Sequence, residues 1–595
     1  MEQTPQDHDA LRRRKNEALL FALALLAFAW FQHPALHDNA LTRLDLTYSI
    51  VLRQSLRIDP YHDNTMDKAL RHGHYYCDKA PGLSFAAAPA LLLIRTVFRT
   101  LDFYPENPLI AWMLIVITVA IPCALACMLL FRLLRREAGG AAAACAVVFT
   151  ALGTLFFIYS GLFYSHAPAA ALLVFALYLV ATPWQQGAAP SSRALLGCGL
   201  LIGCATATEY TAAIPGLAVA GIAMHAAGAR RALPWLVLGG LAPALGLAAY
   251  NNAAFGSPFS IGYFHEADPY FSKEMARGIG GVSWPRPQAL AAILASPTRG
   301  LLWTAPVLLF AIPGCVWGVK QGHRARALCM AGAFGFGAML IVNAGYYEPF
   351  GGHTPGPRLL VCALPLLAAP LAFAWQRLSA LGKIAFLGFG FASFFSNLAL
   401  AAGEPHAPLV FTNPLAQFIW PLMKQGYFSG SLADMFNLPP MISLALIAIL
   451  ISFGLGLLIR KSAQPPPIIS LLCGAAAGMA LFALLTAAGG ISGGPGDQAR
   501  PEYARAWARR GYQAYHAGLY RDMERSLLRA VDNDPYYMQP YVSLGAFYIY
   551  KAGRPDLARP LLQNAETAAR TSGDPLLPVI VDLKKAAAPP KGDDT

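Results

Sequence analysis

The stretch HGHYYCDKAPG, residues 72–82, concentrates an acid, a lysine and two neighbouring tyrosines in one short polar run. Apolar segments flank the loop that holds it, at 17–36 before it and at 83–98 after it. Ionisable groups at the edge of a bilayer cost free energy and are often functional. The stretch therefore indicates chemistry at a membrane surface, within the polar loop 37–107.

The composition of the chain is that of a polytopic membrane protein. Of its 595 residues, 56% are hydrophobic and 13% are charged, and the mean hydropathy is +0.45. The net charge of +13 comes from short basic clusters between apolar segments, which argues against a nucleic-acid partner. Nine of the ten cysteines lie in apolar stretches without a C-x-x-C pair, so a disulfide framework is not expected.

Hydropathy divides the chain into membrane spans, because a helix needs about 20 apolar residues to cross a bilayer. The predicted fold class is an all-α polytopic membrane protein with about 13 transmembrane helices and outer interfacial helices. The predicted spans are 17–36, 108–131, 139–159, 163–183, 194–208, 210–227, 233–252, 300–319, 326–343, 358–375, 383–402, 441–459 and 467–488. The first is long and bulky, and it is predicted to be an anchor instead of a cleaved signal peptide.

Basic loops predict the orientation, since cytoplasmic loops are enriched in Lys and Arg. The amino-terminal cluster at 12–15 is basic, and so are five loops, at 131–140, 228–232, 320–327, 376–383 and 460–464. All of these become cytoplasmic only if the apolar segment 83–98 does not cross. We therefore expect 83–98 to be a helix in the outer interface.

The resulting map has a cytoplasmic amino terminus and an outer carboxy terminus. It collects the sizeable polar stretches on the outer side, at 37–107, 253–299, 344–357 and 403–440. The inner loops are short and carry no P-loop pattern, which disfavours an enzyme that uses nucleotides in the cytoplasm. The high Ala, Arg and Gly content suggests a bacterial inner membrane, with the active site in the periplasm.

A second domain follows the membrane domain, which spans 1–489. After a Gly-rich hinge at 490–496, residues 497–595 are charged and have a helical pattern. Trp507 aligns with Tyr541 and Gly511 with Gly545, a period of 34 residues that resembles tetratricopeptide repeats. Two copies are too few for an independent solenoid, so either residues 575–586 cap them or the repeats lean on the membrane domain. A plain helical hairpin is the alternative, and a protein partner is a possible ligand of the repeats.

Asp45 lies a few residues after the first span, in RLDLTYSIVLRQSLRIDPY (43–61). A carboxylate beside an apolar boundary suits a general base, because partial desolvation raises its basicity. Asp59, Asp63 and Asp67 are in the same loop, and composition does not choose among the four. Capping of the following helix is the other role open to Asp45.

Together these motifs resemble the GT-C glycosyltransferases that use polyprenyl-phosphate sugars, a superfamily that includes protein O-mannosyltransferases and lipid A aminoarabinose transferases. Asp45 matches their acidic residue in the first outer loop, and DKAPG matches a charged motif that follows. GHYYCDKAPG is similar to bacterial members that have Ser where this chain has Cys77. Further similar segments are FYSHAPAAALL (163–173), TEYTA (208–212), YNNAAFGSPFSIGY (250–263), SPTRGLLWTAPVLL (296–309) and GGHTPGPRLL (351–360).

The resemblance implies a sugar transfer with inversion at the anomeric carbon. Asp45 would deprotonate the acceptor hydroxyl, and Lys79 and Arg358 would bind the donor phosphate, with Arg299 near the lipid head group. The other expected pocket residues are Asp78, His74, Tyr75, Tyr76, His166, Glu209, Glu348 and His353. For Lys79 and Arg358 the simpler alternative is an anchor at the membrane interface, and for Asp78 it is an ion pair with Lys79.

The leading hypothesis is an integral-membrane glycosyltransferase that moves a sugar from a polyprenyl-phosphate donor to an outer glycan, lipid or protein acceptor. It requires no cofactor, and no cluster of His, Cys and Asp has the spacing of metal ligands. A flippase or transporter of lipid-linked sugars is a second hypothesis, which the scarcity of charges within the spans disfavours. A non-catalytic scaffold for envelope assembly is a third, suggested by the repeats.

Overall fold

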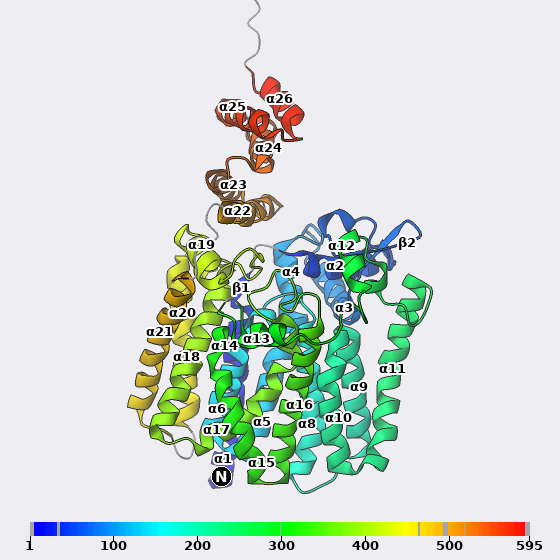
Figure 1. Cartoon of the computed structure of the whole chain (residues 1–595), viewed down its shortest axis with the longest axis vertical. Coiled ribbons are helices and arrows are strands. Elements are labelled where there is room, and N and C mark those ends of the chain that lie inside the picture. Colours follow the sequence, from blue (N-terminus) through cyan, green and yellow to red (C-terminus); the bar gives the residue numbers. More distant parts are fainter. Residues whose placement is uncertain are drawn as a thin grey trace, which may run out of the picture.

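The computed structural model describes residues 5–32, 36–297, 299–461, 465–491, 498–516 and 518–588. The chain is an all-α polytopic membrane protein, as the sequence predicts. A bundle of roughly parallel helices carries a layer of short helices and loops at one end, and a helical tail lies beyond that layer (Figure 1).

Among the described residues, eight helical stretches are long and apolar enough to cross a membrane. They are Pro108–Ala138 (α4, η3 and α5), His166–Gln185 (α8), Tyr210–Ala227 (η4 and α10), Ala229–Phe255 (α11), His323–Gly345 (α16), Ala380–Ala402 (α18), Pro440–Arg460 (α20) and Ile468–Ala488 in α21. Each coincides with one of the thirteen predicted spans.

The other five predicted spans are helical but shorter, broken or preceded by charges. Their elements are α1 (Pro5–Trp30), α6 (Gly140–Leu152) with α7 (Leu155–Tyr159), α9 (Ser192–Thr208), the series α14 (Leu301–Thr304), η6 (Pro306–Phe310) and α15 (Ala311–Gln321), and the series η7 (Arg358–Cys362), η8 (Leu364–Leu367) and α17 (Ala368–Arg377). Prolines at the start of η6 and η8 remove backbone donors, which accounts for the 3₁₀ turns there. The total of thirteen crossings stays a prediction.

Segment 83–98 forms α3 (Gly82–Val97), a 16-residue helix with Pro89 inside it. Its first residue packs against the end of α9, where a Cβ on Gly82 would come within 2.7 Å of the Thr208 amide nitrogen. Leu92, Leu93 and Val97 are 54%, 60% and 61% exposed. An apolar face without a protein partner, on a helix too short to span, is consistent with the predicted interfacial position.

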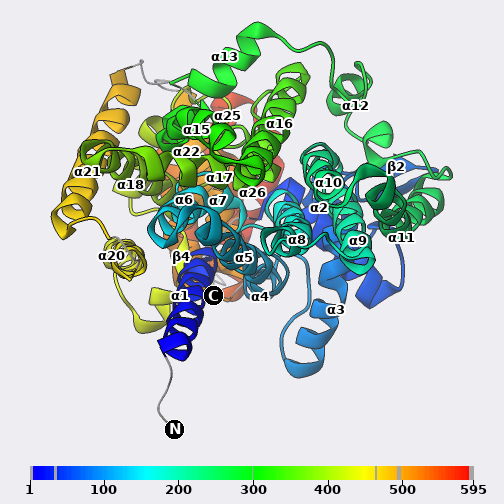
Figure 2. The ribbon, with the colours of Figure 1, turned by 90° about the horizontal axis from the view of Figure 1, so that it is seen from below.

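The basic loops gather at the end of the bundle where α1 begins (Figures 1 and 2). Arg12 donates to the Lys461 carbonyl at 2.5 Å, Glu17 pairs with Arg135 at 2.7 Å, and Arg324 donates to the Gln185 carbonyl at 2.5 Å. The tail lies at the opposite end. This agrees with one shared side for these loops, while the assignment of that side to the cytoplasm stays a prediction.

The opening motif forms a hairpin in the layer of short helices and loops at the end opposite the start of α1, which we call the outer layer after its predicted side. β2 (Ala69–Arg71) pairs antiparallel with β3 (His74–Tyr76), and His72 and Gly73 between them both have positive φ, at 50° and 78°. That is the requirement of a tight two-residue hairpin turn. The chain then reaches Asp78 and Lys79 directly before α3.

The remaining outer elements are small. They are β1 (Phe31–Gln32) paired with β4 (Gly430–Ser431), α2 (Asp38–Tyr48), η1 (Ser49–Arg53), η2 (His62–Asn64), η5 (Gly262–His265), α12 (Pro269–Met275), α13 (Pro287–Ala295), η9 (Leu415–Ile419), α19 (Trp420–Lys424) and η10 (Leu432–Phe436).

The tail contains two helical hairpins and a last helix: α22 (Ala499–His516) with α23 (Tyr520–Asn533), α24 (Met538–Ala546) and η12 (Phe547–Lys551) with α25 (Pro555–Ser572), and α26 (Leu577–Ala586). A Cβ on Gly511 would lie 2.7 Å from the Leu527 side chain, and one on Gly545 would lie 2.8 Å from Leu562. The glycines of the 34-residue period therefore occupy equivalent helix crossings. Of the predicted hinge, 490 and 491 end α21 (Ile468–Ile491), and 492–496 lie outside the described residues.

The first tail helix packs on the outer loop 403–440. Trp507 donates its ring N–H to Gln425 at 3.0 Å, and the Tyr503 hydroxyl donates to the Gln417 carbonyl at 2.5 Å. Arg510 lies 5.4 Å from the centre of the Tyr427 ring, within cation–π range. Both arrangements that the sequence left open for the repeats are present: α22 leans on the membrane domain, and α26 packs on α25, where Lys584 pairs with Glu566 at 2.8 Å.

Candidate functional site

A cavity of about 240 Å³ lies in the outer layer, between the start of α2, the opening motif and the loops around α12 and 346–359. Its lining combines cations, carboxylates, imidazoles and tyrosines. The residues are His37, Asp38, Asn39, Arg43, Met66, Asp67, Lys79, Tyr164, His166, Glu209, Tyr263, Glu266, Phe271, Met275, Tyr346, Tyr347, Glu348, Gly351, Gly352, His353, Arg358, Leu359, His406 and Leu409. Such a wall suits a polar ligand.

Half of the site residues expected from the sequence line this cavity. They are Lys79, His166, Glu209, Glu348, His353 and Arg358. They come from segments that are far apart in the chain, so the fold brings them together. Their chemical roles are not decided by this position and stay predictions.

Lys79 is buried among carboxylates. Its Nζ lies 3.2 Å from Asp67, forms a second ion pair with Asp78, and sits 5.3 Å from the centre of the Tyr263 ring. Burial alone would lower the pKa of Lys79, but the charges of Asp67 and Asp78 outweigh it and hold the pKa above its ordinary value. Lys79 is therefore a permanent cation on the cavity wall.

Arg358 supplies the second cation. It begins η7, and its guanidinium lies 5.7 Å from the centre of the Tyr164 ring. Its Nε is buried without a hydrogen-bond partner among the described residues. Gly351 allows the close approach of the neighbouring loop, since its φ is +86° and a Cβ there would lie 2.9 Å from Arg358. The guanidinium thus has unused donor capacity at the cavity.

His166 and Glu209 form a pair at the inner wall. His166 Nδ1 lies 3.2 Å from Glu209 Oε2, which also accepts the Ser165 hydroxyl at 2.6 Å. Ser165 accepts in turn from Arg43 at 2.7 Å. Glu209 stands in extended conformation between α9 and η4, as expected for the predicted turn between two short spans. The network joins α2 to two membrane helices below the cavity.

Asp45 is fully buried and does not line the cavity. Its Oδ1 accepts from Asn64 at 3.0 Å, and Asn64 also donates to Glu106 at 2.8 Å. Burial raises the pKa of Asp45 well above its ordinary value. The carboxylate of Asp45 therefore points toward Asn64 and Glu106 and not into the cavity. The catalytic role that the sequence assigns to it stays a prediction.

Asp78 and Arg299 are also buried and absent from the lining. Asp78 pairs with Lys79 and accepts from Thr42 at 3.3 Å. Arg299 donates to four backbone carbonyls, those of Thr354, Ala407, Pro408 and Phe411. Burial lowers the pKa of Arg299 to about 10. These four carbonyls use the N–H donors of Arg299, the residue that the sequence placed near the lipid head group.

His74, Tyr75 and Tyr76 lie on β3, outside the lining. His74 pairs with Asp59 at 2.9 Å, and the Tyr75 ring stacks on His62 with 4.0 Å between ring centres. Tyr76 packs edge-on against Phe255. In these contacts the three residues shape the hairpin that carries the motif.

Several lining residues were missed by sequence reasoning. Asp38 starts α2 and accepts the Met66 N–H at 2.8 Å. Glu266 bridges to Ala69 of the hairpin. Asp67, which the sequence offered only as a rival of Asp45 for the base, instead pairs with Lys79. The helical period could have separated Arg43 from Asp45. The two are two residues apart, so on one helix they point about 200° apart and face different surroundings. No sequence signal links Glu266 to this loop.

A group of metal-ligating side chains was also missed. His37, Glu404 and His406 each offer a ligand atom, and these atoms lie within 4.8 Å of one another. Among the described residues, this is the group of His, Cys, Asp and Glu side chains that lie close enough together to hold a metal ion. Sequence spacing could not show it, because His37 is separated from the other two by most of the membrane domain.

Burial raises the pKa of Asp38 and of Glu348, so both carboxylates are more basic than in water. They share the cavity with the cations Lys79 and Arg358. The arrangement can accept a proton at one position and bind a phosphate at another.

Two crystal structures of ArnT from Cupriavidus metallidurans are similar to this chain, one bound to undecaprenyl phosphate and one in the apo state. The first is 14% identical, with a TM-score of 0.45 over 84% of this chain and 81% of that chain. The second has the same identity and TM-score, over 82% and 80%. No protein-family model and no curated protein matches the chain. At so low a TM-score and identity, these likenesses assign neither a ligand nor an activity.

Proposed function

We propose that the chain is an integral-membrane glycosyltransferase of the GT-C kind. It would transfer a sugar from a polyprenyl-phosphate donor to an acceptor hydroxyl outside the cytoplasm. The observation that supports this most is the meeting of Lys79 and Arg358 on one cavity. The two cations come from loops on either side of most of the membrane domain, and the family resemblance names both as phosphate ligands.

The chemistry needs one bond formed and one broken. The acceptor oxygen loses its proton to a carboxylate and attacks the anomeric carbon, while the bond from that carbon to the phosphate oxygen breaks. Its electron pair leaves with the polyprenyl phosphate, whose growing negative charge Lys79 and Arg358 stabilise. A single displacement of this kind inverts the anomeric centre. It draws on no redox partner.

The proton acceptor is proposed among the cavity carboxylates. Asp67 and Glu209 are paired with Lys79 and His166. Asp38 Oδ1 accepts the Met66 N–H. Burial raises the pKa of Asp38, which makes its carboxylate a stronger proton acceptor. We take Asp38 as the base that the cavity favours and Asp45 as the base that the sequence favours.

Transfer from a radiolabelled polyprenyl-phosphate sugar to membrane acceptors tests the proposal. Lys79→Ala and Arg358→Ala should each lower transfer about a hundredfold, the typical effect of removing one group that stabilises a developing anion. Lys68→Ala is the matched control, because Lys68 is in the same loop, donates to the His62 carbonyl and does not line the cavity. Its activity should stay near that of the parent.

Two results would contradict the proposal. One is undiminished transfer in both cation variants with normal expression. The other is movement of the labelled lipid across the membrane without any transfer of sugar, which would favour the transporter. The same assay, run with a panel of donors, would also identify the sugar, the acceptor and the chain length of the lipid.

A further inference from the structure

We propose that His37, Glu404 and His406 form a binding site for one divalent transition-metal ion, and that the ion is Zn²⁺. The three residues are buried where the start of α2 meets the loop 403–440. His37 and His406 also line the cavity of about 240 Å³. This site is separate from the cations and carboxylates used above, and the inference does not rest on the proposed function.

Both distances from the carboxylate oxygen to the imidazole nitrogens suit a tetrahedral ion, and all three ligand atoms lie within 4.8 Å of one another. Glu404 Oε1 lies 3.3 Å from His37 Nε2 and 3.0 Å from His406 Nδ1. Zinc bonds to nitrogen and oxygen are about 2.0–2.2 Å long, so neighbouring ligands in a tetrahedron lie about 3.3 Å apart. The two imidazole rings stack with 3.5 Å between their centres, which keeps both close to the same oxygen.

Hydrogen bonding alone overloads this oxygen. Glu404 Oε1 has three nitrogens within hydrogen-bond range: His37 Nε2, His406 Nδ1, and the His406 backbone N–H at 3.1 Å. A carboxylate oxygen offers about two lone-pair directions. An ion shared by the two rings and Oε1 leaves only the backbone N–H as a hydrogen bond to that oxygen. A cation therefore accounts for the convergence better than three competing donors do.

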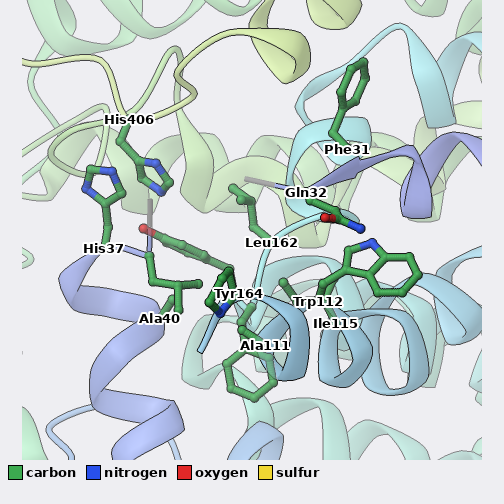
Figure 3. Close-up of a pocket in the computed structure, with 13 residues that line it drawn as sticks. Phe31, Gln32, His37, Ala40, Ala111, Trp112, Ile115, Leu162, Tyr164 and His406 are labelled. Atoms are coloured by element: carbon green, nitrogen blue, oxygen red, sulfur yellow. The ribbon is translucent and has the colours of Figure 1, made fainter. Parts of the chain in front are cut away.

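The surroundings hold the ligands in place. Glu404 and His406 are 2% and 4% exposed, and the Tyr427 hydroxyl donates to Glu404 Oε2 at 2.7 Å. Such outer partners orient the ligands of protein metal sites. A small cavity of about 20 Å³, whose lining includes His37, Tyr164 and His406, adjoins the rings (Figure 3). It has room for one water molecule, the natural fourth ligand.

The ligand types select the metal. Two imidazole nitrogens and one carboxylate oxygen suit Zn²⁺, whereas Mg²⁺ and Ca²⁺ prefer oxygen ligands only. One charge opposes binding: Arg509 of α22 has Nη1 at 3.1 Å from both ring nitrogens of His37. A guanidinium beside the ion lowers the affinity of the site, so removal of that charge should strengthen binding.

Metal content of the purified full-length protein tests the site without any transfer assay. After equilibration with Zn²⁺ and removal of excess metal, mass spectrometry should find about one zinc per chain. Glu404→Gln and His406→Ala should each lose at least nine-tenths of it. His74→Ala is the matched control, since His74 also pairs with a carboxylate, Asp59, in an outer loop. That variant should keep its zinc.

Two further measurements do not depend on the folding of the two ligand variants. Co²⁺ bound to the unaltered protein should give the visible absorption of a tetrahedral nitrogen and oxygen site, and equimolar Zn²⁺ should displace it while Mg²⁺ should not. Arg509→Gln should bind Zn²⁺ several-fold more tightly. The proposal is overturned by less than a tenth of an equivalent of zinc on the unaltered protein, by zinc retained in both ligand variants, or by weaker binding in Arg509→Gln.

Discussion

Arg43 and Asp45 show how one turn of helix assigns opposite surroundings to neighbouring charges. Successive residues of an α-helix are about 100° apart, so these two side chains diverge by about 200°. Arg43 lines the cavity and reaches Ser165, while Asp45 packs on Asn64. Asp38 lies two turns before Asp45 and faces the same 64–66 segment, but at the end of the helix that opens on the cavity.

Substitution of these acids by Asn separates the two candidate bases. Asp38→Asn should reduce transfer from a polyprenyl-phosphate sugar by about 10²–10⁴-fold, the usual contribution of a general base. Asp45→Asn should keep transfer within about tenfold and lower thermal stability, because it changes a buried group that pairs with Asn64. The reverse ranking of the two transfer rates would establish the choice made from the sequence.

The pH dependence of transfer carries the same information. Burial raises the pKa of Asp38, and a base acts only when it is deprotonated. Transfer should therefore fall on the acid side at a pH above about 4, the ordinary value for an aspartate. Initial rates between about pH 4 and pH 8 measure this limb, and a limb at or below the ordinary value would speak against a buried carboxylate base.

How well the sequence predicted each site residue depended on where in the chain the partners of that residue lie. Lys79 is flanked by apolar segments, and its polar motif therefore stood out. Arg299 was equally visible as a charge at a membrane edge, but three of its four carbonyl partners belong to the loop around 407–411, which spacing along the chain does not reveal. The meeting of His37 with Glu404 depends on the fold in the same way.

At the scale of elements, hydropathy located helices better than it described them. The end of α9 and the start of η4 lie on either side of Glu209, where the sequence expected a turn. By contrast, the segments 306–310 and 358–367 are 3₁₀ turns inside apolar runs that hydropathy reads as uniform. Pro306 and Pro365 were available as signals, since proline removes a backbone donor and favours the first turn of a helix.

The close helix crossings of the tail give a prediction about its stability. Gly545→Val should place methyl groups against Leu562, where even a Cβ would lie at 2.8 Å, and destabilise the second hairpin by about 1–3 kcal/mol. Proteolysis of the tail at increasing temperature measures the change. Gln563→Ala on the exposed face of α25 is the control and should change stability by less than about 0.5 kcal/mol.

For the whole molecule, the two ends of the bundle differ in charge and in what they carry. The basic loops meet beside the start of α1, and the cavity and the tail lie at the other end. An outer carboxy terminus requires that Asp102 and Arg500 share one side of the membrane and that Lys461 faces the other.

Single cysteines read by an impermeant maleimide test this arrangement, in a background where the exposed Cys473 is Ser. Asp102→Cys and Arg500→Cys should react in intact cells after opening of the outer membrane. Both positions are exposed, one in the loop before α4 and the other in α22, and α22 lies at the end of the bundle opposite the start of α1. Lys461→Cys should react only after permeabilisation of the inner membrane. Reaction of positions 102 and 500 from opposite sides would refute the odd number of crossings.

The contact between α22 and the start of α2 joins parts of the chain that a ribosome makes far apart in time. Arg509 touches His37, although every helix of the bundle after α1 is synthesised between them. Until α22 has been synthesised and has docked, the surfaces around His37 and Tyr427 stay uncovered. Translation products that stop before α22 (Ala499–His516) therefore lack the helix that covers His37 and Tyr427.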